Sequence, residues 1–388
     1  MAKYLKFLLI IAVLSILLHA VAFVQAEEAD SNLPQNILNI SEPLKISYEK
    51  ARILEVEETT QKIEGEEGVR YETLQRVKIK ILSGKYRGEE KILENTVGTN
   101  PLDLSLKKGN KILVYIEEHK NGSVIFQVQD YWRLNILIWF VVIFLLILLL
   151  LGGRQGLKAI LSLAIAALLI FKILIPQVLT GGNPIRLALV ISIIITIITL
   201  ILVSGLRRKS IAAILGTIGG LLVATVLAIF VGRIANLTGT SSEESRILLI
   251  EFPNLNLQGL LFGSVIIGAL GAVMDIGMSI ASSVTEVKKT YPYARMQELI
   301  KSGLTVGRDV MGTMVNTLIF AYVGVSLPLL LLFTKYGGSY LKFLNFEFVA
   351  EEVVRSIAGS IGLVAAIPLT AIIAGYLEGA KRETKNKK

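Results

Sequence analysis

Long apolar runs constrain this chain more than any other feature. Between Arg133 and Arg154 lie 20 residues without a charged side chain, and several later windows are similarly apolar. About 18 such residues suffice for a helix to cross the hydrocarbon core of a bilayer. With 53% hydrophobic residues, the 388-residue chain is also too apolar for a soluble protein of this size. The sequence therefore predicts an α-helical polytopic membrane protein.

About seven spans are predicted after the N-terminal segment. Their ranges are 134–151, 157–175, 186–205, 210–232, 257–284, 308–333 and 354–377. The predicted cytoplasmic pieces hold 17 Lys and Arg residues, whereas the outer loops and span ends from Arg133 onward hold eight. Cytoplasmic loops of membrane proteins carry such an excess of basic residues. The asymmetry predicts a multi-pass protein of the cell membrane with a cytoplasmic C-terminus.

Residues 1–26 have the pattern of a secretory signal peptide. Two lysines precede an apolar run, and Val24 and Ala26 are the small residues that a signal peptidase reads. An uncleaved anchor helix is the alternative, because the run is long for a signal peptide. Both interpretations place residues 27–132 outside the cytoplasm. The remaining predicted parts are a transmembrane helical domain at 133–380 and a basic cytoplasmic tail at 381–388.

Residues 27–132 differ in character and predict a small all-β extracytoplasmic domain. Apolar and polar residues alternate in β-branched stretches that Gly, Asn and Lys separate. The alternation predicts five short strands in a barrel or a sandwich. The region carries 15 Lys and Arg against 19 Asp and Glu, with no pair of residues arranged for catalysis. We interpret it as a binding or assembly module with a protein partner.

Composition excludes several classes of function. The absence of cysteine excludes disulfides, thiolate nucleophiles and thiolate metal sites. Because His19 and His119 lie outside the main membrane block, histidine-based catalysis in the membrane is excluded as well. The net charge of +9 does not form the basic patch that nucleic acid requires, and no Gly-rich nucleotide-binding motif occurs. We expect a non-enzymatic protein without catalytic residues, metal or cofactor.

The span at 257–284 carries a polar stripe centred on Asp275. Residues three, four and seven apart share a helix face. Around Asp275 this rule collects Ser264, Gly268, Gly271, Ser279, Ser282 and Glu286. A carboxylate at the centre of a span costs roughly 2.5–3.5 kcal/mol on insertion scales, so it must meet a partner or water. The stripe indicates either an ion or ligand site or a structural hydrogen bond that locks two helices.

The next span carries a matching stripe that includes Asn316. Asp275 and Asn316 lie at similar depths, roughly 12–14 Å from the cytoplasmic end of their spans at 1.5 Å per residue. We therefore expect the two stripes to face each other. The predicted ion- or ligand-binding residues are Asp275, Ser279, Ser282, Asn316 and Thr313, and the predicted cytoplasmic mouth consists of Glu286, Arg308 and Asp309. Salt bridges and snorkelling side chains are the alternative for the mouth.

Three long blocks carry a family resemblance. They are GAVMDIGMSIASSVTEVKK (271–289), GRDVMGTMVNTLIFAYVG (307–324) and EEVVRSIAGSIGLVAAIPLTAII (351–373). These blocks resemble the YibE/F-like family of bacterial multi-span membrane proteins, over about residues 45–378. The resemblance implies a β-rich extracytoplasmic segment followed by a multi-span domain. It implies no substrate, because the family is described mostly as membrane proteins without an established one.

Together these patterns favour a permease or ion-coupled transporter of an ion or small solute, with Asp275 at an intramembrane polar site. The alternative is a non-enzymatic membrane scaffold or envelope-assembly factor whose β-domain binds a partner. An intramembrane aspartyl protease is disfavoured, because Asp309 lies at the edge of its span and no Gly-x-Gly-Asp motif occurs. The expected partners are the lipid bilayer, a protein bound by the β-domain, and further copies of the chain in an oligomer.

Overall fold

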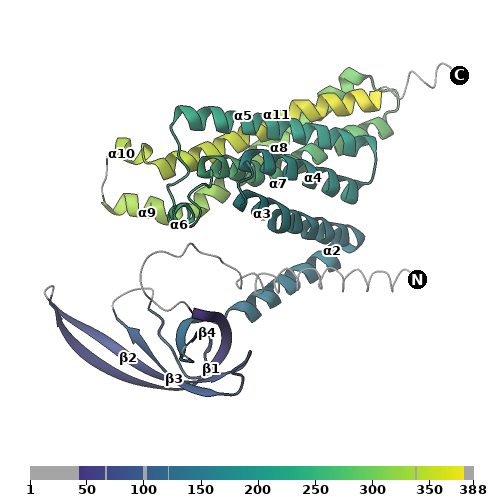
Figure 1. The fold of residues 1–388 in the computed structure, drawn as a ribbon. Helices are drawn as coiled ribbons and strands as arrows, with labels where there is room; N and C mark the ends of the chain where they lie inside the picture. The colour runs from purple at the N-terminus through teal and green to yellow at the C-terminus, as the bar shows by residue number, and fades with distance from the viewer. Residues whose placement is uncertain (1–42, 66–67, 99–102, 121, 337–338, 380–388) are drawn as a thin grey trace, which may run out of the picture. The chain divides into compact units, whose positions relative to one another are not determined.

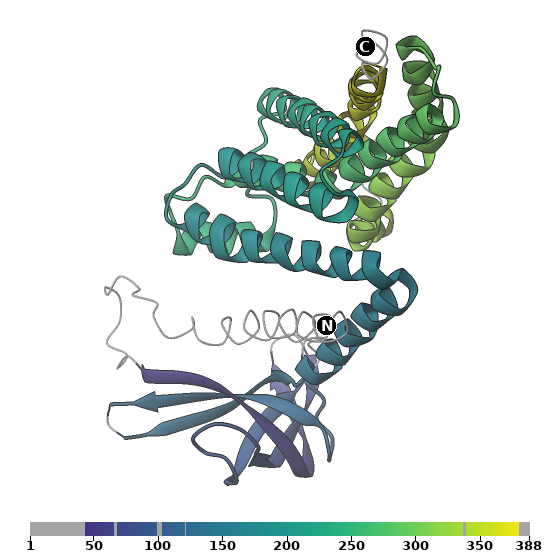
Figure 2. The ribbon, with the colours of Figure 1, turned by 90° about the vertical axis from the view of Figure 1, so that its right-hand side faces the viewer.

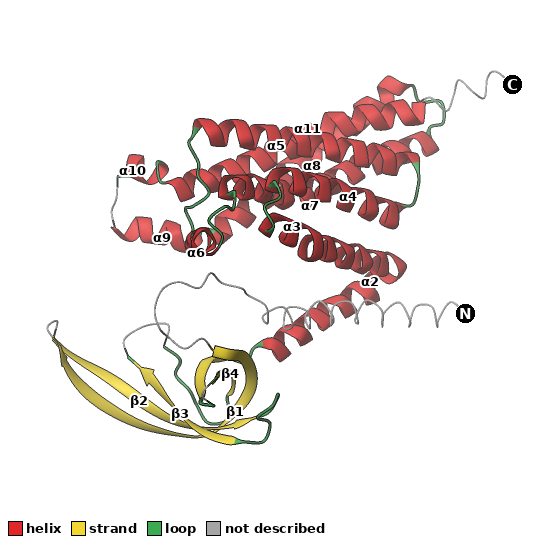
Figure 3. Cartoon of the chain, viewed as in Figure 1, coloured by secondary structure: helices red, strands yellow, loops and turns green. Residues whose placement is uncertain are grey.

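The computed structural model describes residues 43–65, 68–98, 103–120, 122–336 and 339–379. The chain divides into two compact units with their boundary between Ile147 and Leu148. The predicted signal segment at 1–26 and the basic tail at 381–388 lie outside the described residues, as does the start of the predicted β-domain. Within the described part, every strand precedes every helix (Figure 3).

The N-terminal unit contains five antiparallel strands, as the alternating pattern predicts. They are β1 (Pro43–Gly65), β2 (Gly68–Ile81), β3 (Glu90–Val97), β4 (Lys111–His119) and β5 (Val124–Tyr131). Their order across the sheet is β3-β2-β1-β4-β5. The single sheet curls into half of a barrel (Figure 2), so the barrel-like alternative describes it better than the sandwich.

The concave face of this sheet holds a small apolar core. In the second half of β2 every second residue points inward, and Val77, Ile79 and Ile81 are fully buried. Gln75 continues the same inward row and is 1% exposed. Its Nε2 donates to Glu58 Oε1 (2.8 Å) and to the Leu106 carbonyl (3.1 Å). Its Oε1 accepts from the Leu106 N–H and from Asn95 Nδ2, each at 3.0 Å, so the buried amide is satisfied by four hydrogen bonds.

An ion pair joins β4 to the turn that follows β2. Lys85 Nζ lies 2.9 Å from Glu118 Oε2, and the Tyr86 hydroxyl donates to Glu118 Oε1 at 3.0 Å. These two donors hold the pKa of Glu118 below its usual value, with the Lys85 hydrogen bond as the larger cause. The pair therefore favours the folded domain when Glu118 is ionised.

All described elements after the sheet are helical. They are α2 (Leu134–Leu169), the π-helix η2 (Ile170–Leu174), α3 (Ile175–Leu179), α4 (Pro184–Ser204), α5 (Arg208–Ile234), α6 (Glu243–Glu251), α7 (Leu257–Thr290), α8 (Met296–Val325), α9 (Leu327–Tyr336), α10 (Tyr340–Leu344) and α11 (Glu347–Gly379). If α2, η2 and α3 are taken as one continuous helix, five helices are long and apolar enough to cross a membrane. If the bent pair of α8 and α9 is taken as one further span, there are six. These helices are compatible with a multi-pass membrane protein.

α2 is sharply kinked at Gly153, whose φ of 51° and ψ of −120° are not helical. Glycine reaches this backbone conformation without the steric cost that a Cβ brings. A Cβ added to Gly156 would lie only 2.0 Å from the Leu148 carbonyl oxygen. In a straight helix, residues eight positions apart are separated by about 12 Å along the axis. The chain therefore folds back at Gly153, between the predicted spans 134–151 and 157–175.

The predicted continuous span at 308–333 is interrupted in the structure. α8 ends at Val325, and α9 continues at an angle of 59° to it. Pro328 accounts for the break, because a proline has no N–H to donate and disfavours helical geometry in the residue before it. Proline is tolerated in the first turn of a new helix, which is its place in α9.

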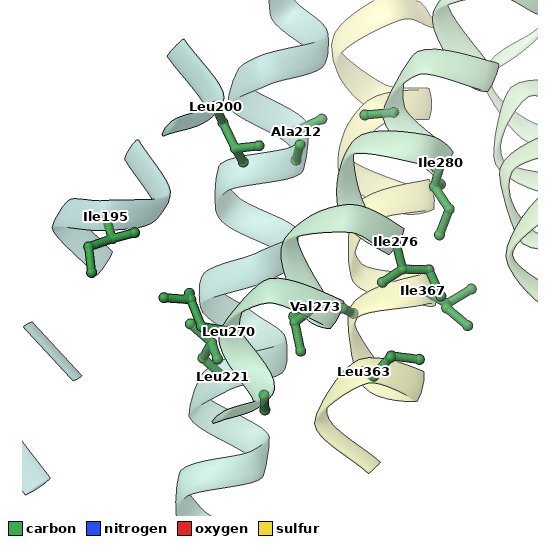
Figure 4. Close-up of a cluster of buried hydrophobic side chains, with 14 of the residues drawn as sticks. Ile195, Leu200, Ala212, Leu221, Leu270, Val273, Ile276, Ile280, Leu363 and Ile367 are labelled. Atoms are coloured by element: carbon green, nitrogen blue, oxygen red, sulfur yellow. The ribbon is translucent and has the colours of Figure 1, made fainter. Parts of the chain in front are cut away.

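The core of the helical unit lies among α5, α7 and α11, which run alongside one another (Figure 1). Figure 4 shows Leu221 of α5, Val273 of α7 and Leu363 of α11 in one buried cluster. At the α5–α11 crossing the two backbones touch. A Cβ on Gly220 would lie 2.6 Å from the Gly362 carbonyl oxygen, so this contact requires glycine. The glycines of the GTIGG sequence (216–220) in α5 thus form a tight contact with α11.

Candidate functional site

Asp275 lies near the middle of α7, on the helix face that points away from the core. Ile276 and Ile280 are fully buried against neighbouring helices. Gly271, Asp275 and Ser279 are exposed and share the opposite face, as their spacing of four predicts. The polar stripe is therefore the uncovered side of α7 in the single chain.

The Asp275 carboxylate has no hydrogen-bond or ion-pair partner among the described residues. Ser279 lies one turn away, and its carbonyl accepts from the Ser283 hydroxyl at 2.9 Å. Ser282 accepts from Lys209 Nζ of α5 at 3.4 Å. At the end of the stripe, Glu286 and Lys289 form an exposed surface pair (2.6 Å), of a kind that contributes little to stability.

Asn316 and Thr313 of α8 do not join Asp275. The inner side of α8 is marked by Gly307, where an added Cβ would lie 2.3 Å from Ile367 of α11 and 3.2 Å from Ile280 of α7. Asn316 is nine residues further along, which is half a turn away on a helix with 3.6 residues per turn. Both Thr313 and Asn316 are exposed. The structure thus places the two polar stripes on separate faces, and a shared site at the level of Asp275 is not formed within one chain.

The predicted mouth residues are likewise on the surface. Arg308 and Asp309 are exposed on α8, and Glu286 is exposed at the end of α7. Within the described ranges, the ion pair of Glu286 is with Lys289, not with Arg308. For Glu286, the salt-bridge alternative matches the geometry.

A second polar cluster connects α7 with α8 and α11. Gly268, two turns from Asp275 on the same stripe, faces Tyr322 of α8. An added Cβ there would lie 2.2 Å from the Tyr322 hydroxyl, so the hydroxyl occupies the space that glycine leaves. On α11, Arg355 Nη1 pairs with Glu352 Oε1 at 3.1 Å. The hydroxyl of Tyr322, Oε2 of Glu352 and Nε of Arg355 are buried and have no partner among the described atoms.

This cluster borders a cavity of about 310 Å³ between the end of α8, helices α9 and α10, and the start of α11. Tyr322, Ser326, Glu352 and Ser356 contribute its polar groups, and the other lining side chains are apolar. Buried polar atoms without protein partners are rare in native structures, and water or a polar ligand commonly satisfies them. Tyr322 and Glu352 therefore bring a hydroxyl and a carboxylate oxygen without protein partners to the cavity wall, and Arg355 is paired with Glu352.

Sequence reasoning did not identify this cluster, although Glu352 and Arg355 lie in the block 351–373 that carries the family resemblance. Glu352 and Arg355 are three residues apart, a spacing that predicts an ion pair on one helix face. Nothing in the sequence places Tyr322 beside Gly268, because that contact depends on how α7 packs against α8. Glu351 was missed as well. It is 7% exposed and accepts a hydrogen bond from the Ser241 hydroxyl at 2.6 Å.

Comparison with known families covers nearly the whole described chain. Residues 140–379 match the family model described as YibE/F-like protein. Residues 46–131 match the model described as the YibE/F family N-terminal domain. No curated protein and no solved structure matches the sequence.

Proposed function

The chain belongs to the YibE/F-like family, and from that premise we propose that it is a permease or ion-coupled transporter of the cell membrane. Its cargo is an ion or small solute, and Asp275 is the binding or coupling group. The proposed mechanism contains no catalytic step. The β-domain lies outside the cytoplasm, as the basic-residue asymmetry supports.

Seven spans fit this proposal. The helical stretch from Leu134 to Leu179 has 46 residues, which is about 69 Å of helix and more than twice the hydrocarbon thickness of a bilayer. The fold-back at Gly153 supports two spans in its place. With α4, α5, α7, the bent pair α8–α9 and α11, the total is seven.

The observation that carries the proposal is the unpartnered carboxylate of Asp275 on a candidate span. An ionisable group at this place is costly, and in membrane proteins it commonly marks an ion or substrate pathway. A hydrogen bond that locked two helices would give Asp275 a partner, and the described residues provide none. This favours binding over the structural alternative.

The second polar cluster supports a path along the same face. The Tyr322 hydroxyl touches Gly268, which is about 10 Å from Asp275 along the helix axis. Gly271 lies between them, and an added Cβ there would have no atom within 4 Å. A solute or proton held at the cavity beside Tyr322 and Glu352 would therefore reach Asp275 without crossing the packed core.

The test is ion flux in proteoliposomes that contain the full chain. Asp275→Asn keeps the size and hydrogen-bonding capacity of the side chain but removes its charge. We expect normal insertion and folding with at least a tenfold loss of ion-dependent flux, whereas the control Glu286→Gln, an exposed carboxylate on the same stripe, keeps it. Unchanged, pH-insensitive flux in Asp275→Asn would leave only a structural role for this residue.

A scaffold or assembly function is the second candidate. It is favoured by exposed apolar side chains that share a cross-strand row through Glu117 of β4, namely Ile46 of β1 (44% exposed) and Ile125 of β5 (41%). Such side chains are common at protein–protein contacts. If the cellular effect of the protein is lost when the β-domain is deleted but kept in Asp275→Asn, the scaffold function is supported.

A further inference from the structure

The outward face of α8 is polar and uncovered in the single chain. It consists of Asp309, Gly312, Thr313, Asn316, Thr317 and Phe320, all of which are exposed. Between Arg308 and Val325, Leu318 is the one buried residue. Between Asp309 and Phe320, the polar side of α8 is thus turned away from the protein core.

Two of the polar groups on this face are satisfied locally, and others are not. The hydroxyl of Thr313 donates to the Val310 carbonyl at 2.9 Å, and that of Thr317 donates to the Thr313 carbonyl at 2.8 Å. Asn316 and Asp309 have no hydrogen bond or ion pair to any residue in the described ranges. In hydrocarbon an amide or carboxylate without a partner is costly, so this face must meet protein or water.

Gly312 is a second and independent indication. An added Cβ at this position would have nothing within 4 Å. No neighbour within the described part of the chain therefore requires a glycine here. Small residues on a membrane helix allow another backbone to approach closely, and Gly312 lies one turn from Asn316 on the same face.

The first arm of α2 cannot satisfy this face. Between Ile136 and Leu151 its side chains are hydrocarbon except for Trp139, which has a single N–H to donate. A second copy of the chain provides what is missing. An amide both donates and accepts, so Asn316 can pair with its own counterpart, and Arg308 can approach Asp309 of the other copy.

We propose that two copies of the chain associate through the outward face of α8, with Asn316 of each copy bonded to Asn316 of the other. The residues nearest the two-fold axis are Asp309, Gly312, Asn316 and Phe320. Their spacing of three and four residues is the spacing of two helices that cross at about 20°. The interface is independent of the transport proposal, because it uses a different face from Asp275.

The absence of cysteine in the chain makes a direct test possible. Membranes that contain the single-cysteine variants Gly312→Cys or Asn316→Cys are treated with an oxidant. The controls are Val226→Cys on α5 and Ile372→Cys on α11, at positions that are 64% and 51% exposed. A disulfide requires the two Cα atoms within about 7 Å. We expect a cross-linked species of twice 42.4 kDa from the α8 variants and none from the controls.

Three results would overturn the proposal. One is the absence of cross-linking at both α8 positions, and another is equal cross-linking at the controls. The third is an unlinked Asn316→Cys that reacts readily with a membrane-impermeant maleimide, which would mean that water covers this face. A cross-link from Asn316→Cys to an added Ile138→Cys in the same chain would assign the face to α2 instead.

A second measurement uses the cysteine-free chain. Asn316→Leu removes the paired amides from the interface but leaves the exposed helix surface apolar. We expect roughly a tenfold rise in the dissociation constant of the dimer in detergent, measured by light scattering, in line with interhelical polar contacts. Val226→Leu on the exposed side of α5 should leave that constant within about twofold. An unchanged dissociation constant in Asn316→Leu would remove Asn316 from the contact.

Discussion

Gln75 in the β-sheet and Asn316 in α8 carry the same amide group in opposite surroundings. Gln75 is 1% exposed and makes four hydrogen bonds within its own domain. Asn316 is exposed and makes none with the described residues. The sheet satisfies this buried amide internally, as an independently folded domain does for most of its buried polar groups. The helical unit leaves polar groups without protein partners, some of them buried beside Tyr322 and others on outward faces such as that of Asn316.

If the polar outward faces add little to the stability of the helical unit, its tightly packed core must provide most of it. Gly220→Val is the most severe test of this packing. The new side chain would collide with the Gly362 backbone and with Ala366 and Val273. Backbone atoms cannot move aside as flexible side chains do, so we expect a loss of at least about 3 kcal/mol or no folded protein. Helix propensity opposes this loss, because valine is a better helix former than glycine.

The matched control is Gly324→Val on α8, where an added Cβ has nothing within 4 Å. Thermal unfolding in detergent should be unaltered in this variant. A folded, equally stable Gly220→Val protein would show that the α5–α11 contact is looser than the described geometry.

The β-domain half of the comparison is tested by Gln75→Leu. This change leaves the N–H and carbonyl of Leu106 without partners in a buried place, so we expect a loss of about 2–4 kcal/mol in urea unfolding. Gln127→Leu on the exposed side of β5 should stay within about 0.5 kcal/mol of the parent. The fragment 43–132 suits this measurement, because its core is its own and we expect it to fold alone. A disordered circular dichroism spectrum of the fragment would refute that independence.

Acid should weaken the sheet through Glu118. Because its pKa is lowered in the folded domain, the Lys85 pair stabilises the fold above the ordinary glutamate pKa of about 4.3. The unfolded chain takes up the proton first as the pH falls, so this stabilisation disappears on passing below that value. We expect Glu118→Gln to have a lower melting temperature at pH 7 and a smaller acid-induced decrease. Parallel melting curves of both proteins from pH 7 to pH 3 would contradict the role of this pair.

The smallest effect is expected from Asn316→Leu on the fold of a single chain. No hydrogen bond within the described structure is lost, so the free energy of unfolding of monomeric protein in dilute detergent should change by less than about 0.5 kcal/mol. The contrast with Gln75→Leu, the same exchange of an amide for leucine, measures the difference between the two domains directly. A loss above about 1 kcal/mol in the monomer would mean that Asn316 has a partner within its own chain.

Much of the fold was predictable because the relevant signals are local. Alternation located all five strands, and apolar runs located α4, α5, α7 and α11. The break before α9 was not predicted, because hydropathy does not register the missing N–H of Pro328. The spacing around Asp275 correctly identified one helix face. It could not reveal that Asn316 faces away from it, because a single sequence does not say which sides of two helices meet. The Tyr322–Gly268 contact was missed for the same reason.

The break after Val325 also determines how well α8 fits a bilayer. From Val310 to Val325 the helix has 16 residues, or about 24 Å, so α9, at 59° to it, must supply the rest of a hydrocarbon core of about 30 Å. In a thicker bilayer the bent pair is too short, and such a mismatch is relieved when lipids thin around the protein or when short helices cluster together. The strength of self-association through α8 should therefore increase with acyl-chain length.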